Sequence, residues 1–344
     1  MMDFTNLSMS SVVIPNNIRL STNNISNMFY ACDTLITSEF NHPNVTNMSN
    51  TYAVCRRLTS PPVCGNNVTN MRYAYGNCYN LTGSPVCGNN VINMASTYLG
   101  CYRLTGSPVC GNNVTDMAKA YRDCNNLTGS PVCGNNVTNM YYTYYDCYNL
   151  TGSPVCGNNV TDMASAYSGC NNLTGSPVCG NKVTHMSGAY ASCYNLTGSP
   201  ACGNNVTGMY YAYSNCHNLT GHPVCGNNVT NMSYAYTECY NLTGSPVCGN
   251  NVTNMAGAYR NCHNLGAATV YFMSKNIVNA TGCFYGKNNS RRYNIHVPNN
   301  STTLNTFRIN NINSIVGANI TWTNSGRNFY NTAYNIYIYA NTSM

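Results

Sequence analysis

The chain has 344 residues, a formal net charge of +7 and only 7% charged residues, against roughly 25% in an average domain. Its basic residues are thinly spread, with Arg56-Arg57 and Arg291-Arg292 as the adjacent pairs, so the sequence lacks the basic stripe of a nucleic-acid-binding surface. No apolar run is long enough to cross a bilayer, and residues 1–20 hold no continuous apolar core of a signal peptide.

A 23-residue repeat runs without insertion from Leu58 to Asn264, with the consensus LTGSPVCGNNVTNMxxAYxxCxN. A unit this short cannot bury an apolar face alone, so its copies must stack. We therefore expect an α/β solenoid in three parts. An N-terminal segment with an abbreviated capping coil covers 1–34, ten coils cover 35–264, and an abbreviated last coil with a β-rich C-terminal domain covers 265–344.

The first half of each coil is predicted to be a short strand that pairs in parallel with its copy in the next coil. In one coil this strand covers 81–87, where Pro85 marks a position whose amide is dispensable. Gly88 and the two asparagines after it have the residue types that a tight corner needs.

The second half of each coil is predicted to be a short helix, because its apolar residues recur at i, i+3, i+4 and i+7. In one coil these residues are Met71, Ala74, Tyr75 and Cys78. Thr69 or Asn70 is placed to cap the helix, and Asp116 holds the same place in another coil. A column of tyrosines, one in each coil from Tyr52 to Tyr259, follows from this pattern and is interpreted as core. The asparagine before each leucine, such as Asn80, is expected to form a side-chain ladder.

All but one of the 21 cysteines fall in two columns. One column follows Pro-Val, as Cys87 does, and the other ends the helical half, as Cys101 does. Because the copies are related by translation and the total is odd, a disulfide framework would leave cysteines over. The second column is interpreted as buried thiols, whereas the first is equally consistent with thiols and with disulfides. Gaps of 9 and 14 residues lack the close pairs of a structural zinc site.

Leu-Thr at the start of the strand, Val-Thr before the helix and Ala-aromatic-x-x-Cys at its end resemble the 23-residue BspA-type leucine-rich repeat, from about Leu35 to Cys283. The resemblance implies a leucine-rich-repeat fold and a non-enzymatic role, as in bacterial surface adhesins and phage virion proteins. Residues 293–301 resemble the ending that closes such arrays. Residues 320–326 and 334–340 alternate with a period of two, which predicts strands of a cap or attachment domain.

Variation among the copies suggests where a ligand could bind. The Thr-Gly-Ser-Pro edge is nearly identical from coil to coil, whereas the outer positions of the helical half change freely. The candidate binding residues on the variable half are Tyr73, Tyr141, Tyr142, Tyr210, Tyr211 and Tyr234. Those on the uniform edge are Thr82, Thr105, Thr128 and Thr151.

Three functions are compatible with such a surface. The first is an adhesion or receptor-binding component of a phage tail or cell surface that recognises a glycan or surface polymer. The second is a structural spacer or decoration protein of a virion or surface fibre, and the third is ice binding through the threonine file. An enzyme is not expected, because the six histidines are scattered and the eight acidic residues form no converging pair. No cofactor or metal is expected either.

The expected partners are a cell-surface glycan or protein receptor, or other virion or surface proteins bound through the C-terminal domain; an oligomer is compatible with the sequence. With thiols in place and no signal peptide visible, we expect folding in a reducing cytoplasm before display on a virion or cell surface.

Overall fold

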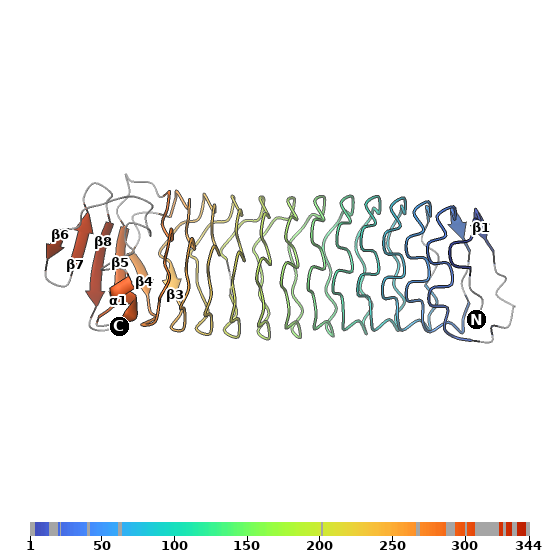
Figure 1. Ribbon diagram of the computed structural model, residues 1–344, viewed down its shortest axis with the longest axis horizontal. Helices are drawn as coiled ribbons and strands as arrows, with labels where there is room; N and C mark the ends of the chain where they lie inside the picture. Colours follow the sequence, from blue (N-terminus) through green and yellow to red (C-terminus); the bar gives the residue numbers. More distant parts are fainter. Residues whose placement is uncertain are drawn as a thin grey trace. The chain divides into compact units, whose positions relative to one another are not determined.

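The computed structural model describes residues 4–13, 20, 22–39, 42–60, 64–200, 202–265, 269–286, 293–299, 301–306, 323–325, 328–331 and 336–341. The chain divides into two compact units, Met1–Leu173 and Thr174–Met344. Within each unit the chain winds into stacked coils (Figure 1). The regular elements are β1 (Ser11–Val12), β2 (Thr37–Ser38), β3 (Val247–Cys248), β4 (Thr269–Phe272), β5 (Tyr293–Pro298), α1 (Thr302–Asn305), β6 (Thr323–Ser325), β7 (Asn328–Asn331) and β8 (Ile336–Asn341).

The second half of each coil is a run of turns instead of the predicted helix. Alternate amides bond to the carbonyl three residues back, as Ala74 N does to Met71 O at 2.9 Å. The amides between them donate to the next coil, as Tyr73 N does to Ala95 O at 2.9 Å. Half of these backbone hydrogen bonds therefore join one coil to its neighbour. Among the described residues the only helix is α1, which lies outside the coils.

Two left-handed residues per coil, four positions apart, explain why no helix forms. In one coil they are Tyr73 at φ 54° and Asn77 at φ 60°, and the same two positions recur from coil to coil. A right-handed helix cannot contain such residues. The predicted apolar face is nonetheless correct, because all four of its residues are buried. The predicted cap also forms, since Asn70 Oδ1 accepts a hydrogen bond from Arg72 N at 3.0 Å and closes the first turn.

These left-handed positions provide a stability test. Gly100 has φ +71°, and a Cβ there would lie 2.5 Å from Asn77 Oδ1. Gly83 has φ +80°, but no atom lies within 4 Å of the place that a Cβ would take. We expect Gly83→Ala to lower the unfolding free energy by about 1 kcal/mol, the conformational cost alone, and Gly100→Ala to lower it further because of the added clash. Urea denaturation of the two variants measures the difference, and equal costs would contradict the described packing of Asn77.

The predicted seven-residue strand does not form in the described coil of residues 81–87. Thr82 N donates to Thr59 O in the preceding coil at 2.9 Å, but Gly83 then turns the chain away. The hydroxyl of Tyr98 lies 2.8 Å from Val86 N and 2.7 Å from Val86 O, and so occupies the groups that a sheet would use. Parallel pairing occurs elsewhere in the coil, as single bridges between asparagines such as Asn70 and Asn93. The prediction was therefore right about parallel stacking and wrong about the place and length of the strand.

The tyrosine column is confirmed as core. All ten rings, from Tyr52 to Tyr259, are at most 1% exposed. Within unit Met1–Leu173, successive rings of the column stack with their centroids 5.3 to 5.7 Å apart. Phenylalanines extend the column at its ends: Phe4 stacks on Phe29 at 5.6 Å, and Phe284 stacks on Tyr259 at 5.8 Å. Phenylalanine suits the ends because it buries a ring without a hydroxyl that needs a partner.

All 21 cysteines are thiols. In the column that ends the turn half, which we call the inner cysteines, the thiol donates to the carbonyl of the tyrosine one coil back; Cys78 Sγ lies 3.1 Å from Tyr52 O. The prediction of buried thiols is thus confirmed for this column. In the column after Pro-Val, which we call the outer cysteines, most side chains are half-buried. The predicted asparagine ladder also forms, as between Asn264 Nδ2 and Asn241 Oδ1 at 3.1 Å.

Regular strands gather where the coils of unit Thr174–Met344 end. Six strands form one sheet in the order β3-β4-β5-β8-β7-β6, parallel from β3 to β8 and antiparallel beyond (Figure 1). Strands are therefore present in both segments where the sequence predicts them, 320–326 and 334–340, although residues 320–322, 326 and 334–335 lie outside the described residues. Because β3 belongs to a repeat coil, the sheet continues directly from the coils. At the other end of the chain β1 pairs in parallel with β2.

Candidate functional site

Four of the six candidate tyrosines occupy the first left-handed position of their coils. Tyr73, Tyr142, Tyr211 and Tyr234 all have φ of 54° or 55°. In the other coils this position is held by asparagine, serine or glycine, and in one coil by Lys119. A bulky residue gains nothing there from the backbone, and a left-handed conformation costs it about 1 kcal/mol or more. Backbone strain of this kind is a reason to look for function in the outward-pointing ring.

In unit Thr174–Met344 three of the candidate tyrosines form one cluster, which we call the tyrosine cluster: Tyr210, Tyr211 and Tyr234. Tyr211 and Tyr234 stack face to face at 5.0 Å, and Tyr210 packs edge-on against Tyr211 at 4.3 Å. Tyr210 is 45% exposed. Gly257 leaves room for the ring of Tyr234, because a Cβ there would lie 2.5 Å from it. Tyr210 is exposed at the surface, and Tyr211 and Tyr234 are half-buried beside it.

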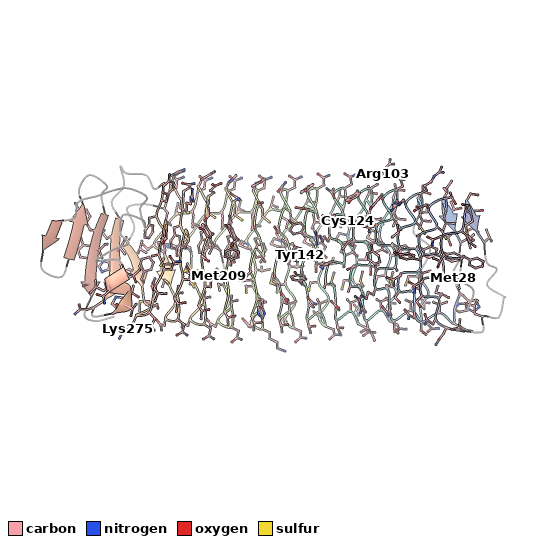
Figure 2. The ribbon with its side chains drawn as sticks, viewed as in Figure 1. Met28, Arg103, Cys124, Tyr142, Met209 and Lys275 are labelled. Atoms are coloured by element: carbon pink, nitrogen blue, oxygen red, sulfur yellow. The ribbon has the colours of Figure 1, made fainter. Side chains whose placement is uncertain are left out.

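In unit Met1–Leu173 the candidates Tyr141 and Tyr142 pack against each other at 4.5 Å (Figure 2). Tyr145, which the sequence analysis missed, joins them at 4.9 Å from Tyr142. The guanidinium of Arg122 lies 5.3 Å from the centre of the Tyr142 ring and 5.2 Å from that of Tyr145. This second group is therefore aromatic and cationic, unlike the neutral tyrosine cluster.

Tyr73 does not join either group. Its hydroxyl accepts a hydrogen bond from Asn77 Nδ2 at 2.6 Å, and its ring lies so close to Gly76 that a Cβ there would clash with it. It lines an open groove of about 460 Å³ with Ser49, Asn50, Asn70, Arg72 and Ser96.

The four candidate threonines are exposed and lie one per coil. Thr82 lines a different groove from Tyr73, of about 360 Å³, together with Arg57 and Arg103. Thr82 Oγ1 donates to Thr59 O at 2.8 Å and Thr151 Oγ1 to Gly129 O at 3.3 Å. In these two threonines the hydroxyl proton is used within the coils, and the oxygen remains an acceptor for an outside group.

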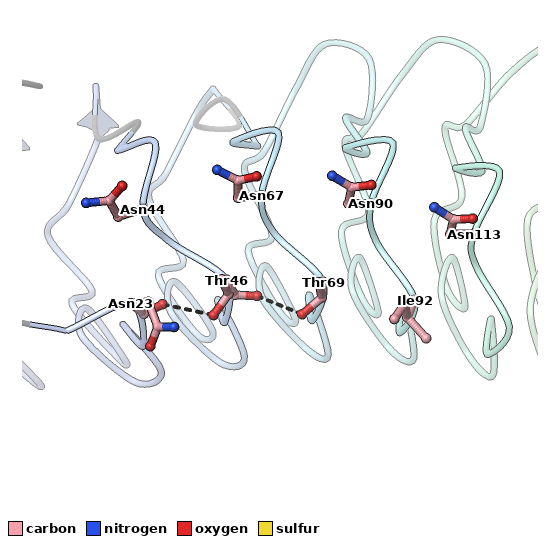
Figure 3. Close-up of a pocket in the computed structure, with 8 residues that line it drawn as sticks. All are labelled: Asn23, Asn44, Thr46, Asn67, Thr69, Asn90, Ile92 and Asn113. Atoms are coloured by element: carbon pink, nitrogen blue, oxygen red, sulfur yellow. Dashed lines mark hydrogen bonds between the residues drawn. The ribbon is translucent and has the colours of Figure 1, made fainter.

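A third surface consists of residues that the sequence analysis assigned only to turns and caps. A shallow groove of about 610 Å³ runs over the Asn-Asn-Val-Thr corners of successive coils (Figure 3). One row of its lining is all asparagine, and the other contains Asn23, Thr46, Thr69 and Ile92. Asn67 Nδ2 donates to Pro43 O at 2.7 Å, and Asn90 Nδ2 to Asn66 O at 2.8 Å. Thr69 Oγ1 donates to Thr46 O at 3.2 Å. Each of these groups thus gives one hydrogen bond to the preceding coil, and the asparagine amides keep a second N–H and an oxygen for an outside group.

An exposed aromatic file was also missed. In unit Thr174–Met344, Tyr194, His217, Tyr240 and His263 stack at separations of 4.6 to 5.4 Å. His217 and His263 are two of the six histidines that look scattered in the sequence. Their rings stack because residues 23 positions apart lie over one another, and this register was available from the repeat alone.

Within the described ranges, no group of three or more His, Cys, Asp or Glu side chains is arranged to hold a metal ion. In the same part of the chain, no helix has the length and apolar character to span a membrane.

Residues 16–105 match the family described as "Mycoplasma protein of unknown function, DUF285". None of the curated proteins matches the chain. Among solved structures, the chain is similar to a leucine-rich repeat protein from Bacteroides ovatus, with a TM-score of 0.52 and 14% sequence identity over 85% of this chain and 77% of that one. Together with the 23-residue period and the parallel pairing of its coils, this structural likeness shows that the chain has a leucine-rich-repeat fold.

Proposed function

We propose that the chain is a non-enzymatic adhesion or receptor-binding protein of a cell surface or phage tail, and that it recognises a glycan or a similar neutral surface polymer. The observation that carries the proposal is the tyrosine cluster, which places two stacked rings at left-handed positions where most other coils carry asparagine, serine or glycine. Neighbouring coils supply the rings, so the cluster depends on the solenoid for its shape.

The chemistry of the surface favours a hydroxyl-rich, uncharged ligand. Tyrosine rings offer flat apolar faces, and their hydroxyls can donate and accept hydrogen bonds. The asparagine row of the groove adds amide groups that repeat once per coil, at roughly the 4.8 Å spacing of paired backbones. A polymer with regularly spaced hydroxyl groups matches both features, whereas a chain with 7% charged residues offers little to a highly charged ligand.

A substitution taken from the repeat itself tests the proposal. At the Tyr210 position other coils carry alanine, as at Ala95, and at the Tyr211 and Tyr234 positions other coils carry serine, as at Ser96. The variant Tyr210→Ala/Tyr211→Ser/Tyr234→Ser should therefore keep the fold. We expect it to lose glycan or whole-cell binding by about tenfold or more, because central aromatic contacts dominate such interfaces.

The matched control is Tyr141→Ala/Tyr142→Ser, which makes the same changes in the other unit. Loss of binding in the first variant alone assigns the ligand to the tyrosine cluster. Equal binding by the wild type and the first variant would overturn that assignment.

The alternative is a spacer or decoration protein. The near-identity of the Thr-Gly-Ser-Pro edge among coils favours it, because a surface that does not contact a particular partner has no reason to diversify. In this alternative the C-terminal sheet would attach the chain to other virion or surface proteins. Failure of the wild type to bind any glycan or cell in the same screen would favour the spacer.

A further inference from the structure

Several outer cysteines lie against a methionine sulfur. Cys64 Sγ is 3.5 Å from Met71 Sδ, Cys87 Sγ is 3.5 Å from Met94 Sδ, and Cys179 Sγ is 4.0 Å from Met186 Sδ. The methionines are fully buried, whereas Cys87 and Cys179 are half-buried. The Cys87 and Cys179 pairs therefore lie just beneath the surface, with the thiol on the solvent side, whereas Cys64 is buried.

The backbone supports a sulfur ligand at these positions. Gly203 N, in the following coil, donates to Cys179 Sγ at 3.3 Å. Burial raises the pKa of Cys64, and a hydrogen bond from the Gly88 backbone opposes that rise. Hydrogen bonds from amides to sulfur stabilise thiolates at metal centres and tune them. The glycines are needed for this approach, since a Cβ on Gly88 would lie only 3.2 Å from Cys64 Sγ.

We propose that each of these Cys–Met pairs binds one soft monovalent cation, of the Cu(I) type, between Sγ and Sδ. Thiolate and thioether sulfur is the ligand set that selects Cu(I) over harder ions. Metal–sulfur bonds of about 2.3 Å span the observed sulfur separations at an angle of roughly 100° to 120°. That angle leaves a third coordination position open toward solvent.

Charge balance favours a monovalent ion. On binding, the thiol proton leaves to solvent, the cation takes its place on Sγ, and Sδ donates a lone pair; no electron is transferred. A neutral thiol becomes a neutral metal thiolate, so the buried site gains no net charge. A divalent ion in the same place would leave one positive charge uncompensated, which a half-buried apolar site disfavours.

The test is a titration of the reduced, full-length chain with Cu(I) under anaerobic conditions, in competition with a chromophoric Cu(I) chelator. We expect tight Cu(I) sites that raise the thermal midpoint of the chain, and an X-ray absorption spectrum dominated by copper–sulfur scattering. Met94→Leu keeps the volume of the side chain and removes one sulfur. It should bind one Cu(I) fewer per chain at a chelator concentration that leaves the other sites filled.

Met48→Leu is the matched control. Met48 holds the same buried position in its coil, but Asn41 stands there in place of an outer cysteine. The Met48→Leu variant should bind as many Cu(I) ions per chain as the wild type. Cys87→Ala provides an independent variant at a half-buried position and should also lose one Cu(I). Unchanged Cu(I) stoichiometry and affinity in Met94→Leu, or a spectrum dominated by nitrogen and oxygen scattering, would overturn the proposal.

Discussion

Replacing Tyr121 by alanine should lower the unfolding free energy by about 3 to 5 kcal/mol, the cost of deleting a buried aromatic side chain. The ring is fully buried and stacks on Tyr98 at 5.6 Å and on Tyr144 at 5.5 Å. Its loss leaves a cavity and removes a stacking partner from both neighbouring coils, and in a repeat array stability resides in such nearest-neighbour contacts. Urea denaturation followed by far-ultraviolet circular dichroism measures the loss.

Phenylalanine at the same position separates the contribution of the ring to stability from that of its hydroxyl. Tyr121 Oη donates to Val109 O at 2.6 Å and accepts from Val109 N at 3.0 Å. Tyr121→Phe leaves both backbone groups without this partner and should cost about 1 to 3 kcal/mol.

Tyr259→Phe is the matched control, because the Tyr259 hydroxyl is buried and has no hydrogen-bond partner in the described structure. Removing it should be neutral or slightly stabilising, since an unpaired buried hydroxyl is itself unfavourable. If Tyr121→Phe and Tyr259→Phe lower the unfolding free energy by the same amount, the hydrogen bonds of Tyr121 to Val109 make no net contribution to stability.

Burial could be predicted from the sequence more reliably than backbone conformation. Residues at i, i+3, i+4 and i+7 face inward in a helix, and they also face inward in the run of turns that the chain adopts. Periodicity alone could not distinguish the two. Composition could have done so: the residue before each inner cysteine is Asn77, Gly100, Asp123 or a similar type in most coils. Asparagine, glycine and aspartate at one fixed position are typical of a left-handed residue.

The predicted strand failed for a related reason. The glycine of Thr-Gly-Ser-Pro has positive φ in coil after coil, as at Gly83 and Gly106, and a glycine repeated at one position is a sign of such a turn. The competition between Tyr98 and the neighbouring coil for the Val86 backbone was not visible in the sequence, because it depends on where a side chain twelve residues away ends. Where pairing does occur, at β3, the hydroxyl of Tyr259, twelve residues after Val247, has no partner in the described structure.

For the candidate binding residues, too, some contacts could be predicted from the repeat and others depend on the backbone conformation. Variability among the copies identified Tyr210, Tyr211 and Tyr234 one by one, and the 23-residue register then accounts for the contact between Tyr211 and Tyr234. The edge-on contact of Tyr210 and the position of Arg122 over Tyr142 depend on side-chain directions within a left-handed turn. A helix at the same residues would have pointed these side chains elsewhere.

Alkali should unfold the chain steeply, beginning near pH 9. Burial raises the pKa of the inner thiols, to about 12 for Cys216 and Cys262, and raises that of the core phenols well above 10, as for Tyr121. Each of these groups is neutral when protonated, and its folded-state pKa lies above its unfolded value of 9.0 or 10.0. The stability it contributes is therefore complete below the unfolded pKa and is lost as the pH rises toward the folded one.

The expected slope follows from the number of groups. Above its unfolded pKa each fully buried thiol or phenol removes about 1.4 kcal/mol of unfolding free energy per pH unit. With one inner thiol and one core phenol in each coil, even a few coils lose several kcal/mol between pH 10 and 11. Urea midpoints measured from pH 7 to 11 should stay nearly constant up to about pH 8.5 and then fall with a slope that increases at each step.

The order in which tyrosines ionise gives a second measurement. After a jump to high pH, tyrosine rings at the surface should ionise within the mixing time, whereas the core column should ionise only as fast as the coils unfold. The tyrosinate absorbance should then rise in two phases, the slower one matching the loss of circular dichroism. If all thirty tyrosines titrated in the fast phase while the circular dichroism was retained, the column could not be the core of the coils, and the stacking of Tyr98, Tyr121 and Tyr144 would not be what holds them together.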